Sequence, residues 1–146
     1  MKDTLGVISW KDEMRKALVM LLVLLLVLLS PSALAAPGSW VASMPGRMVA
    51  MSDRAVATQS VAAPPTAHVG EARMTLIQWQ YRHPPGTPLR AWLCHPEQCV
   101  PLTGMRGATQ AFAGMQAQAP IHFRFALAPG QRPVKVQGLQ VIVNYQ

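Results

Sequence analysis

Few residues of this chain have the side chains that catalysis requires. The two cysteines, Cys94 and Cys99, are separated by four residues, and we expect a disulfide, which removes a thiol nucleophile. The carboxylates after residue 35 are far apart in the sequence: Asp53, Glu71 and Glu97. No Gly-x-Ser-x-Gly, His-Glu-x-x-His or phosphate-loop pattern occurs. The sequence therefore predicts no catalytic residues, because a paired-carboxylate mechanism would need distant groups to converge.

One segment contains soft metal ligands. Met44, Met48 and Met51 lie close together, and thioethers suit Cu(I). Their spacing is loose, however, and methionine commonly fills gaps in hydrophobic cores. The histidines show no paired ligand spacing: His68, His83, His95 and His122. We predict no metal site and no cofactor, and keep a copper-binding module as an alternative.

Aromatic and basic residues indicate binding chemistry. Trp79, Tyr81 and Trp92 could stack on a sugar, although the first two lie at alternate positions of one strand and are expected in the core. Trp92 lies on a less apolar face, where the outward Arg90 and Arg124 could join it in a basic face; a plain solvated face is the alternative. The predicted partner-binding residues are Arg90, Trp92, Pro101, Thr103 and Arg124.

The element that positions these residues is a hairpin around the cysteines. Apolar runs at 89–93 and 100–102 flank them, and a four-residue loop would pair Cys94 with Cys99 and Trp92 with Pro101. If the cysteines form a non-hydrogen-bonded pair, Pro101 directs its missing N–H away from the partner strand. The strand at 99–103 is therefore expected at a sheet edge.

Alternating apolar and polar residues predict further strands. The clearest are 74–82, 121–127 and 134–145; the last is apolar enough to be central, with Gly138 as a candidate bulge. In 121–127 the odd-numbered residues point inward, and His122, Arg124 and Ala126 point outward. Other strands are expected at 39–43 and 108–112, with turns at 104–107 and 114–120 and short possible strands at 47–51 and 55–61.

These patterns favour an all-β fold. No amphipathic helical period occurs after the N-terminal segment, and turn signals recur between the strands. We predict a single small β-sandwich of about seven strands with one disulfide-closed hairpin. A small closed β-barrel is the alternative architecture.

The N-terminal segment, 1–35, is typical of a secretory signal peptide. Residues 17–29 are apolar throughout but too few to span a bilayer, and Ala33-Leu34-Ala35 is a small-x-small cleavage pattern. Cleavage is expected after Ala35 rather than after Ala36, which would put Pro37 directly beyond the cut bond. An uncleaved anchor helix is the alternative.

A second methionine, Met14, lies directly before the basic residues and the apolar run. Met14-Arg15-Lys16 alone forms a compact basic region before the apolar run, so Met14 is a candidate start. After cleavage, residues 36–146 are enough for one domain, with 44–70 as its least ordered part because Ala, Pro, Ser and Thr dominate there.

The charge of residues 36–146 argues against nucleic acid as a partner. Nine Lys and Arg against three acids give a net charge of +6, but no run of three basic residues and no reading motif occurs. The predicted export also separates the protein from nucleic acid. An acidic protein surface, anionic lipid or a cell-wall polymer fits the charge better.

Several segments in order resemble the flagellar FlhE family. They are Gly38-Ser-Trp40, Thr75-Leu-Ile-Gln-Trp-Gln-Tyr81, Trp92-Leu-Cys94, Cys99-Val-Pro-Leu102, Gly107-Ala-Thr109 and Val141-Ile-Val-Asn-Tyr145. The resemblance covers nearly the whole domain after the signal. The chain departs from the family pattern in the extension before Met14 and in 44–70.

The resemblance implies a periplasmic accessory protein of the bacterial flagellum, encoded with the export apparatus. The family is linked to preventing misplaced periplasmic flagella and proton leakage, as a chaperone or regulator of rod and ring assembly, and it has no catalytic residues to carry over. The cysteine pair is carried over as a structural disulfide. The expected partners are flagellar rod, hook or ring proteins, with no stable membrane anchor after cleavage. A copper-binding or glycan-binding β-sandwich module is the alternative.

Overall fold

The computed structural model describes residues 2–29 and 37–146, which fall into two units, a helix and a β domain. Helix α1 begins at Lys2 and ends at Leu28. From Ser9 onward its side chains are exposed, including those of the apolar run. Among the described residues, no helix is long and apolar enough to cross a membrane. The predicted cleavage site at Ala35 and Ala36 lies outside the described residues.

The described part of the β domain has nine strands rather than about seven. The additional two are the short strands that the sequence left open within 44–70. In chain order the strands are β1 (Gly38–Met44), β2 (Arg47–Val49), β3 (Val56–Ala57), β4 (Met74–Arg82), β5 (Leu89–His95), β6 (Gln98–Leu102), β7 (Arg106–Thr109), β8 (His122–Leu127) and β9 (Val134–Tyr145). A single 3-10 turn, η1 (Pro65–Ala67), lies between β3 and β4.

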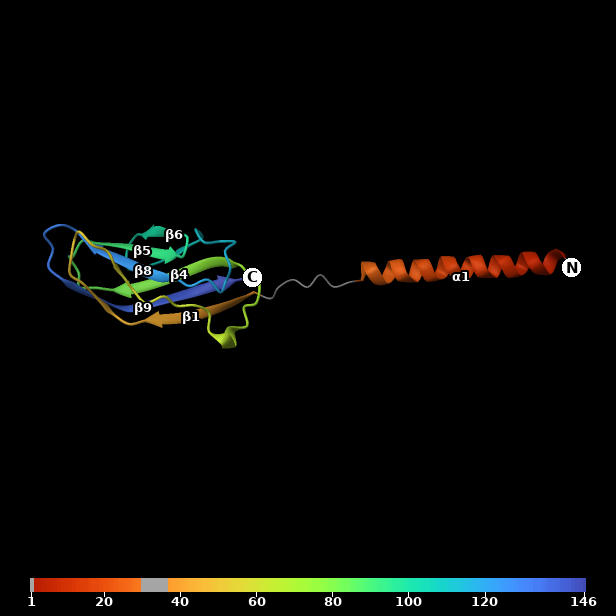
Figure 1. The fold of residues 1–146 in the computed structure, drawn as a ribbon, viewed down its shortest axis with the longest axis horizontal. Helices are drawn as coiled ribbons and strands as arrows, with labels where there is room; N and C mark the ends of the chain where they lie inside the picture. The colour runs from red at the N-terminus through yellow and green to blue at the C-terminus, as the bar shows by residue number, and fades with distance from the viewer. Residues whose placement is uncertain (1, 30–36) are drawn as a thin grey trace. The chain divides into compact units, whose positions relative to one another are not determined.

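The strands form two antiparallel sheets in a sandwich-like arrangement. One sheet has the order β1-β9-β4-β7, with β2 also pairing to β9, and the other has the order β3-β8-β5-β6. Figure 1 shows β6, β5 and β8 in one layer and β4, β9 and β1 in the other. The apolar strand β9 is central, as predicted, and β6 and β7 are the last strands of their sheets.

The core lies between the sheets and is built by the alternation in β4 and β8. Their inward side chains are at most 5% exposed: Ile77, Trp79, Tyr81, Phe123, Phe125 and Leu127. Tyr81 meets Phe123 and Phe125 edge-on, with ring centroids 6.1 and 5.1 Å apart. Ala126 was expected on the outward side but is buried. Its methyl group is short, and the much longer side chain of Arg90 belongs to the residue directly opposite on β5.

The predicted pairing of the cysteine hairpin is confirmed. Cys94 lies opposite Cys99 and Trp92 opposite Pro101, and the cysteines form a disulfide. Their Cα atoms are 4.0 Å apart, the short separation of a non-hydrogen-bonded pair. The predicted four-residue loop is wrong, because His95 also pairs with Gln98 and leaves a two-residue turn. The backbone N–H of Glu97 donates to His95 Nδ1 and tightens that turn.

The strand predicted at 108–112 begins two residues earlier and ends three residues earlier in the structure. β7 runs from Arg106 to Thr109, so it includes two residues of the expected turn and leaves Phe112 in a turn of its own. The hydroxyl of Thr109 accepts the backbone N–H of Ala111, which ends the strand locally. Phe112 is still buried, with its ring centroid 6.0 Å from that of His95.

The segment 44–70 pairs with β8 through β3, and one buried polar residue, Thr58, adds side-chain hydrogen bonds next to that pairing. Thr58 Oγ1 accepts the backbone N–H of Phe123 at 2.9 Å and donates to Met44 Sδ at 3.4 Å. The backbone N–H of Thr58 in turn donates to the carbonyl of Phe123. Met44, Val49, Thr58 and Val69 are buried, so side chains throughout this segment contribute to the domain interior.

Candidate partner-binding surface

The sheet order β8-β5-β6 brings the predicted site residues together on its outer face. Arg124 of β8 lies opposite Trp92 of β5, which lies opposite Pro101 of β6. Arg90 precedes Trp92 by two residues and therefore shares its face. Thr103 follows the end of β6 and is exposed. Three strands thus deliver Arg90, Trp92, Pro101 and Arg124 to one surface.

Two guanidinium groups lie over one indole ring. Arg90 Cζ is 5.7 Å and Arg124 Cζ is 5.9 Å from the centroid of the Trp92 ring, so both arginines make cation–π contacts. Arg124 Nη1 is also 3.9 Å from Cys99 Sγ. We refer to Arg90, Trp92 and Arg124 as the Trp92 platform. Trp92 is only partly buried, whereas both arginines are exposed.

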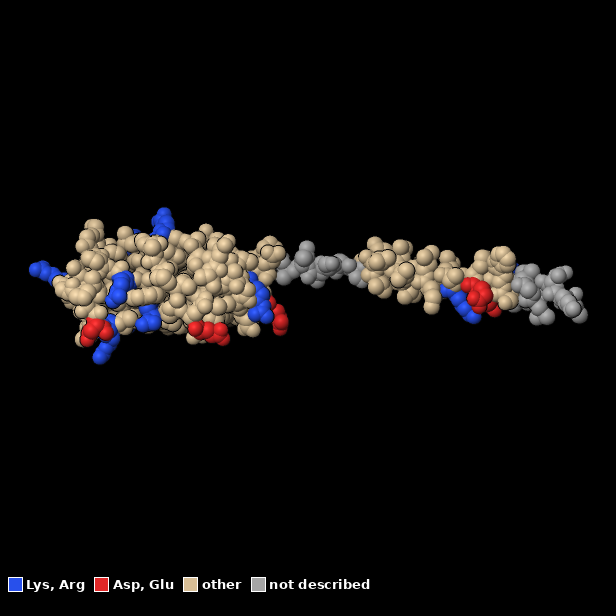
Figure 2. Space-filling model, turned by 90° about the horizontal axis from the view of Figure 1, so that it is seen from above, with Lys and Arg blue, Asp and Glu red and all other residues tan. Residues whose placement is uncertain are grey.

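The platform carries charge that the rest of the β domain does not neutralise. In the described part of the chain the one ion pair is Lys16–Glu13, on α1, so neither platform arginine has a carboxylate partner there. Figure 2 shows the Lys and Arg side chains of the β domain in several separate places with uncharged residues between them. A local pair of arginines on an aromatic ring suits an acidic or aromatic group of a partner.

An open strand edge adjoins the platform. β6 is the last strand of its sheet and pairs only with β5 in the described part of the chain. Because Trp92 and Pro101 are a non-hydrogen-bonded pair, the outward backbone groups belong to Cys99, Pro101 and Thr103. Pro101 has no N–H, so this edge presents the carbonyl groups of all three residues but the N–H groups of Cys99 and Thr103 alone.

His122 adds a titratable group to the same face. It lies opposite Cys94 and two residues before Arg124. Burial, and secondarily the positive charge of Arg124, lower the pKa of His122 below its ordinary value of 6.5. The sequence predicted an outward position for His122, and the structure makes it partly buried there, so its lowered pKa favours the neutral imidazole at pH 7.

We expect the stability of the protein to fall as the pH drops below the ordinary histidine pKa of 6.5. Between that value and the lowered pKa of folded His122, the unfolded chain binds a proton at this residue and the folded chain does not. The His122→Gln variant should therefore show a smaller loss of unfolding free energy in urea titrations between about pH 7 and pH 5. Gln131→Ala, an exposed change that involves no titratable group, should keep the wild-type slope. An unchanged slope in His122→Gln would contradict the expectation.

The residues behind the copper-binding and glycan-binding alternatives lie in different environments. Met44 is buried and its sulfur accepts a hydrogen bond from the Thr58 hydroxyl, whereas Met48 and Met51 are exposed, so the three do not share one surface. In the described residues, no group of three His, Cys, Asp or Glu side chains could hold a metal ion. Trp79 and Tyr81 are core residues at 5% and 4% exposed, which leaves Trp92 as the partly exposed ring of the predicted stacking set.

Three hollows elsewhere on the β domain have no recognisable signal in the sequence. One, of about 690 Å³, lies beside the hairpin turn and includes both Arg73 and Glu97. The other two, of about 510 and 540 Å³, lie on the opposite sheet and share Gln80 and Arg106. None of the predicted partner-binding residues lines any of them. The residues that line each hollow come from separate segments of the chain, and the strand order brings them side by side.

Comparisons with known proteins agree on one family. The model of the family "Flagellar protein FlhE" matches residues 46–146. The flagellar protein FlhE of Escherichia coli (strain K12) is 38% identical over 132 residues, which is 84% of this chain and 98% of that protein. The Salmonella typhimurium (strain LT2) protein of the same name is 41% identical over 78 residues, 50% of this chain and 60% of that protein.

A solved structure adds the fold to this agreement. The structure described as "Crystal Structure of FLHE" superposes with a TM-score of 0.66 at 32% sequence identity, covering 77% of this chain and 99% of that one. The sandwich-like arrangement is thus shared with a relative whose sequence is also similar. Since the family match spans most of the chain, the protein belongs to the flagellar protein FlhE family.

Proposed function

We propose that this FlhE-family protein is a non-catalytic periplasmic accessory protein of the flagellum that acts by binding other proteins. Its partners are flagellar rod, hook or ring proteins, and it acts as a chaperone or regulator of their assembly, which prevents misplaced periplasmic flagella or proton leakage. The observation that carries the proposal is the Trp92 platform, with two arginines unpaired among the described residues, beside the open edge of β6.

The edge and the platform suit one extended partner segment. A strand added to β6 would bond to the outward backbone groups at Cys99, Pro101 and Thr103, and its alternate side chains would reach the platform face. Because Pro101 lacks an N–H, β6 pairs less readily with exposed strand edges of unrelated proteins. Specificity would then come from side chains that fit Trp92 and its arginines.

The predicted export signal supports the proposed compartment. α1 exposes a continuous apolar run, and the sequence after it contains the small-residue cleavage pattern of a secretory signal. The Cys94–Cys99 disulfide is stable in an oxidising compartment such as the periplasm. The three acids of the β domain are all exposed, which suits a binding role rather than acid–base catalysis.

The test is recovery of partners from periplasmic extract of flagellated cells, with the tagged protein as bait and mass spectrometry as readout. Wild type should enrich rod, hook or ring proteins, and Trp92→Ala should reduce that recovery about tenfold, as expected when a central aromatic contact is lost. Thr103→Pro, which removes an outward N–H from the edge, should also reduce recovery. Arg132→Ala, an exposed change outside the platform, is the matched control.

Thermal melts of each variant separate lost binding from lost folding. Undiminished recovery with Trp92→Ala and Thr103→Pro would contradict the proposed surface. Stoichiometric Cu(I) retained through dialysis would favour the copper-binding alternative instead. Saturable glycan binding that is lost in Trp92→Ala would favour the glycan-binding alternative.

A further inference from the structure

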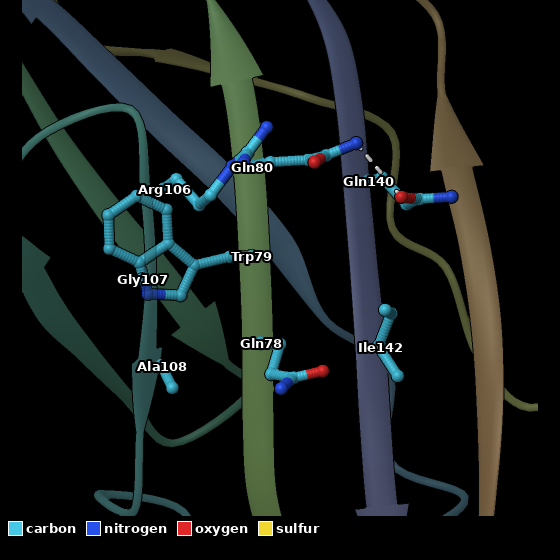
Figure 3. Close-up of a pocket in the computed structure, with 8 residues that line it drawn as sticks. All are labelled: Gln78, Trp79, Gln80, Arg106, Gly107, Ala108, Gln140 and Ile142. Carbon is cyan, nitrogen blue, oxygen red and sulfur yellow. Dashed lines mark hydrogen bonds between the residues drawn. The ribbon is translucent and has the colours of Figure 1, made fainter.

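The outer face of the other sheet carries a groove that the Trp92 platform does not use. A hollow of about 510 Å³ lies over β7, β4 and β9. Figure 3 shows the side chains that line it. Its outward side chains are three amides, one arginine, the small Ala108 and the apolar Ile142. The lining residues are Gln78, Trp79, Gln80, Arg106, Gly107, Ala108, Gln140 and Ile142.

A polar row crosses the three strands of this groove. Arg106 lies opposite Gln80, and Gln80 lies opposite Gln140. Gln80 Nε2 donates to Gln140 Oε1 at 2.9 Å, so this bond leaves the Gln140 amide N–H groups and the Gln80 carbonyl oxygen for other partners. In Figure 3 the Arg106 side chain reaches across toward Gln80. Guanidinium and amide donors thus converge at one end of the hollow.

A second arginine extends the groove. The neighbouring hollow, of about 540 Å³, shares Gln80 and Arg106 and adds Arg82 and Gly138. Gly138 has φ +65° and forms the bulge predicted from the sequence, with the register of β4 and β9 shifting between Gln80 and Arg82. A Cβ atom at Gly138 would lie 3.0 Å from Arg82 Nε, so the glycine makes room for this guanidinium against β9.

The charge of the groove is one-sided. Neither hollow is lined by any Asp or Glu, and no carboxylate lies within ion-pair distance of Arg82 or Arg106 in the described part of the chain. Arginine binds carboxylates in a planar, two-pronged geometry, and amide N–H groups add neutral donors beside it. The ligand chemistry that fits is a carboxylate carried on an extended, hydrogen-bonding chain.

We infer that this groove binds an acidic peptide segment. Sugars are recognised largely by stacking on exposed rings, but the aromatic liners of the two hollows, Trp79 and Tyr81, are 5% and 4% exposed. A peptide instead finds β7, the last strand of its sheet, along one side of the groove and can pair with its backbone. The groove and the Trp92 platform lie on different sheets, so the domain has two separate surfaces for protein segments.

The experiment uses protein expressed from the full chain and a fluorescein-labelled oligoglutamate peptide, with binding followed by fluorescence anisotropy. The Arg82→Gln/Arg106→Gln variant should bind the peptide at least about tenfold more weakly, because both charge-assisted contacts are lost. Arg54→Gln/Arg132→Gln removes the same charge outside the groove and should change the affinity by less than about twofold. Oligoglutamine of the same length should not bind.

A second measurement locates the peptide independently of the arginine variants. In NMR titrations, the side-chain amide signals of Gln80 and Gln140 should shift with oligoglutamate at the same concentrations that change the anisotropy. Equal loss of affinity in both double variants would overturn the inference, since binding would then follow net charge alone. Tighter binding of a carboxylated polysaccharide than of the peptide, or unshifted Gln80 and Gln140 signals, would overturn it as well.

Discussion

Replacing Trp40 with alanine is expected to lower the free energy of unfolding by about 3–5 kcal/mol, among the largest losses that a single substitution in this domain can cause. Trp40 lies on β1 and is 2% exposed. Its Nε1–H donates to the buried carbonyl of Ala117 at 2.9 Å, across 77 residues of chain. The substitution removes a large buried ring and also leaves that carbonyl without its donor.

Urea titrations followed by far-UV circular dichroism measure this loss without relying on tryptophan fluorescence. Val41→Ala, the next residue on the strand, is the matched control, because Val41 is 50% exposed and should cost less than about 1 kcal/mol. Trp40→Phe keeps most of the apolar volume and isolates the hydrogen bond, with an expected cost of about 1–3 kcal/mol. Equal stability of Trp40→Ala and Val41→Ala would show that β1 is not anchored by this ring.

Strand positions were predictable because alternation is a local property of the chain. In β4 every second residue from Ile77 to Tyr81 is buried, as the sequence pattern required. The exceptions arise where a distant contact outweighs the local pattern. Phe112 has the side chain of a strand residue, yet the Thr109 hydroxyl ends β7 and Phe112 is buried from within a turn. Thr58, in a segment rich in turn formers, is buried because its hydroxyl completes the pairing with Phe123.

The outward positions of the residues in the proposed partner-binding surface were predictable one by one, but their assembly into one surface was not. The alternation of side chains along each strand predicted outward positions for Trp92 and Arg124. The cysteine spacing predicted the pairing of β5 with β6. Nothing local to the chain determines that β8 pairs with the other side of β5, which is what brings Arg124 over the Trp92 ring. The groove on the opposite sheet depends even more on strand order, since its polar row joins β7, β4 and β9.

The second large effect is expected at Phe123, whose replacement by alanine should cost about 3–5 kcal/mol of unfolding free energy. Phe123 is fully buried on the inner face of β8, its ring stacks on Phe125 with centroids 5.7 Å apart, and it meets Tyr81 edge-on. The space left by the ring cannot close without moving both neighbouring aromatics. Chemical denaturation of purified protein measures the loss.

Arg124 is the matched control because it follows Phe123 on the same strand and faces the other way. Arg124→Ala should change stability by less than about 0.5 kcal/mol, since the residue is exposed and its cation–π contact with Trp92 is solvated. In the pull-down from periplasmic extract, however, Arg124→Ala should reduce recovery of flagellar partners while its melting temperature stays near wild type. If Arg124→Ala destabilised the protein as much as Phe123→Ala, the platform would be part of the structural core; if it left recovery unchanged, β8 would contribute only its inner face to function.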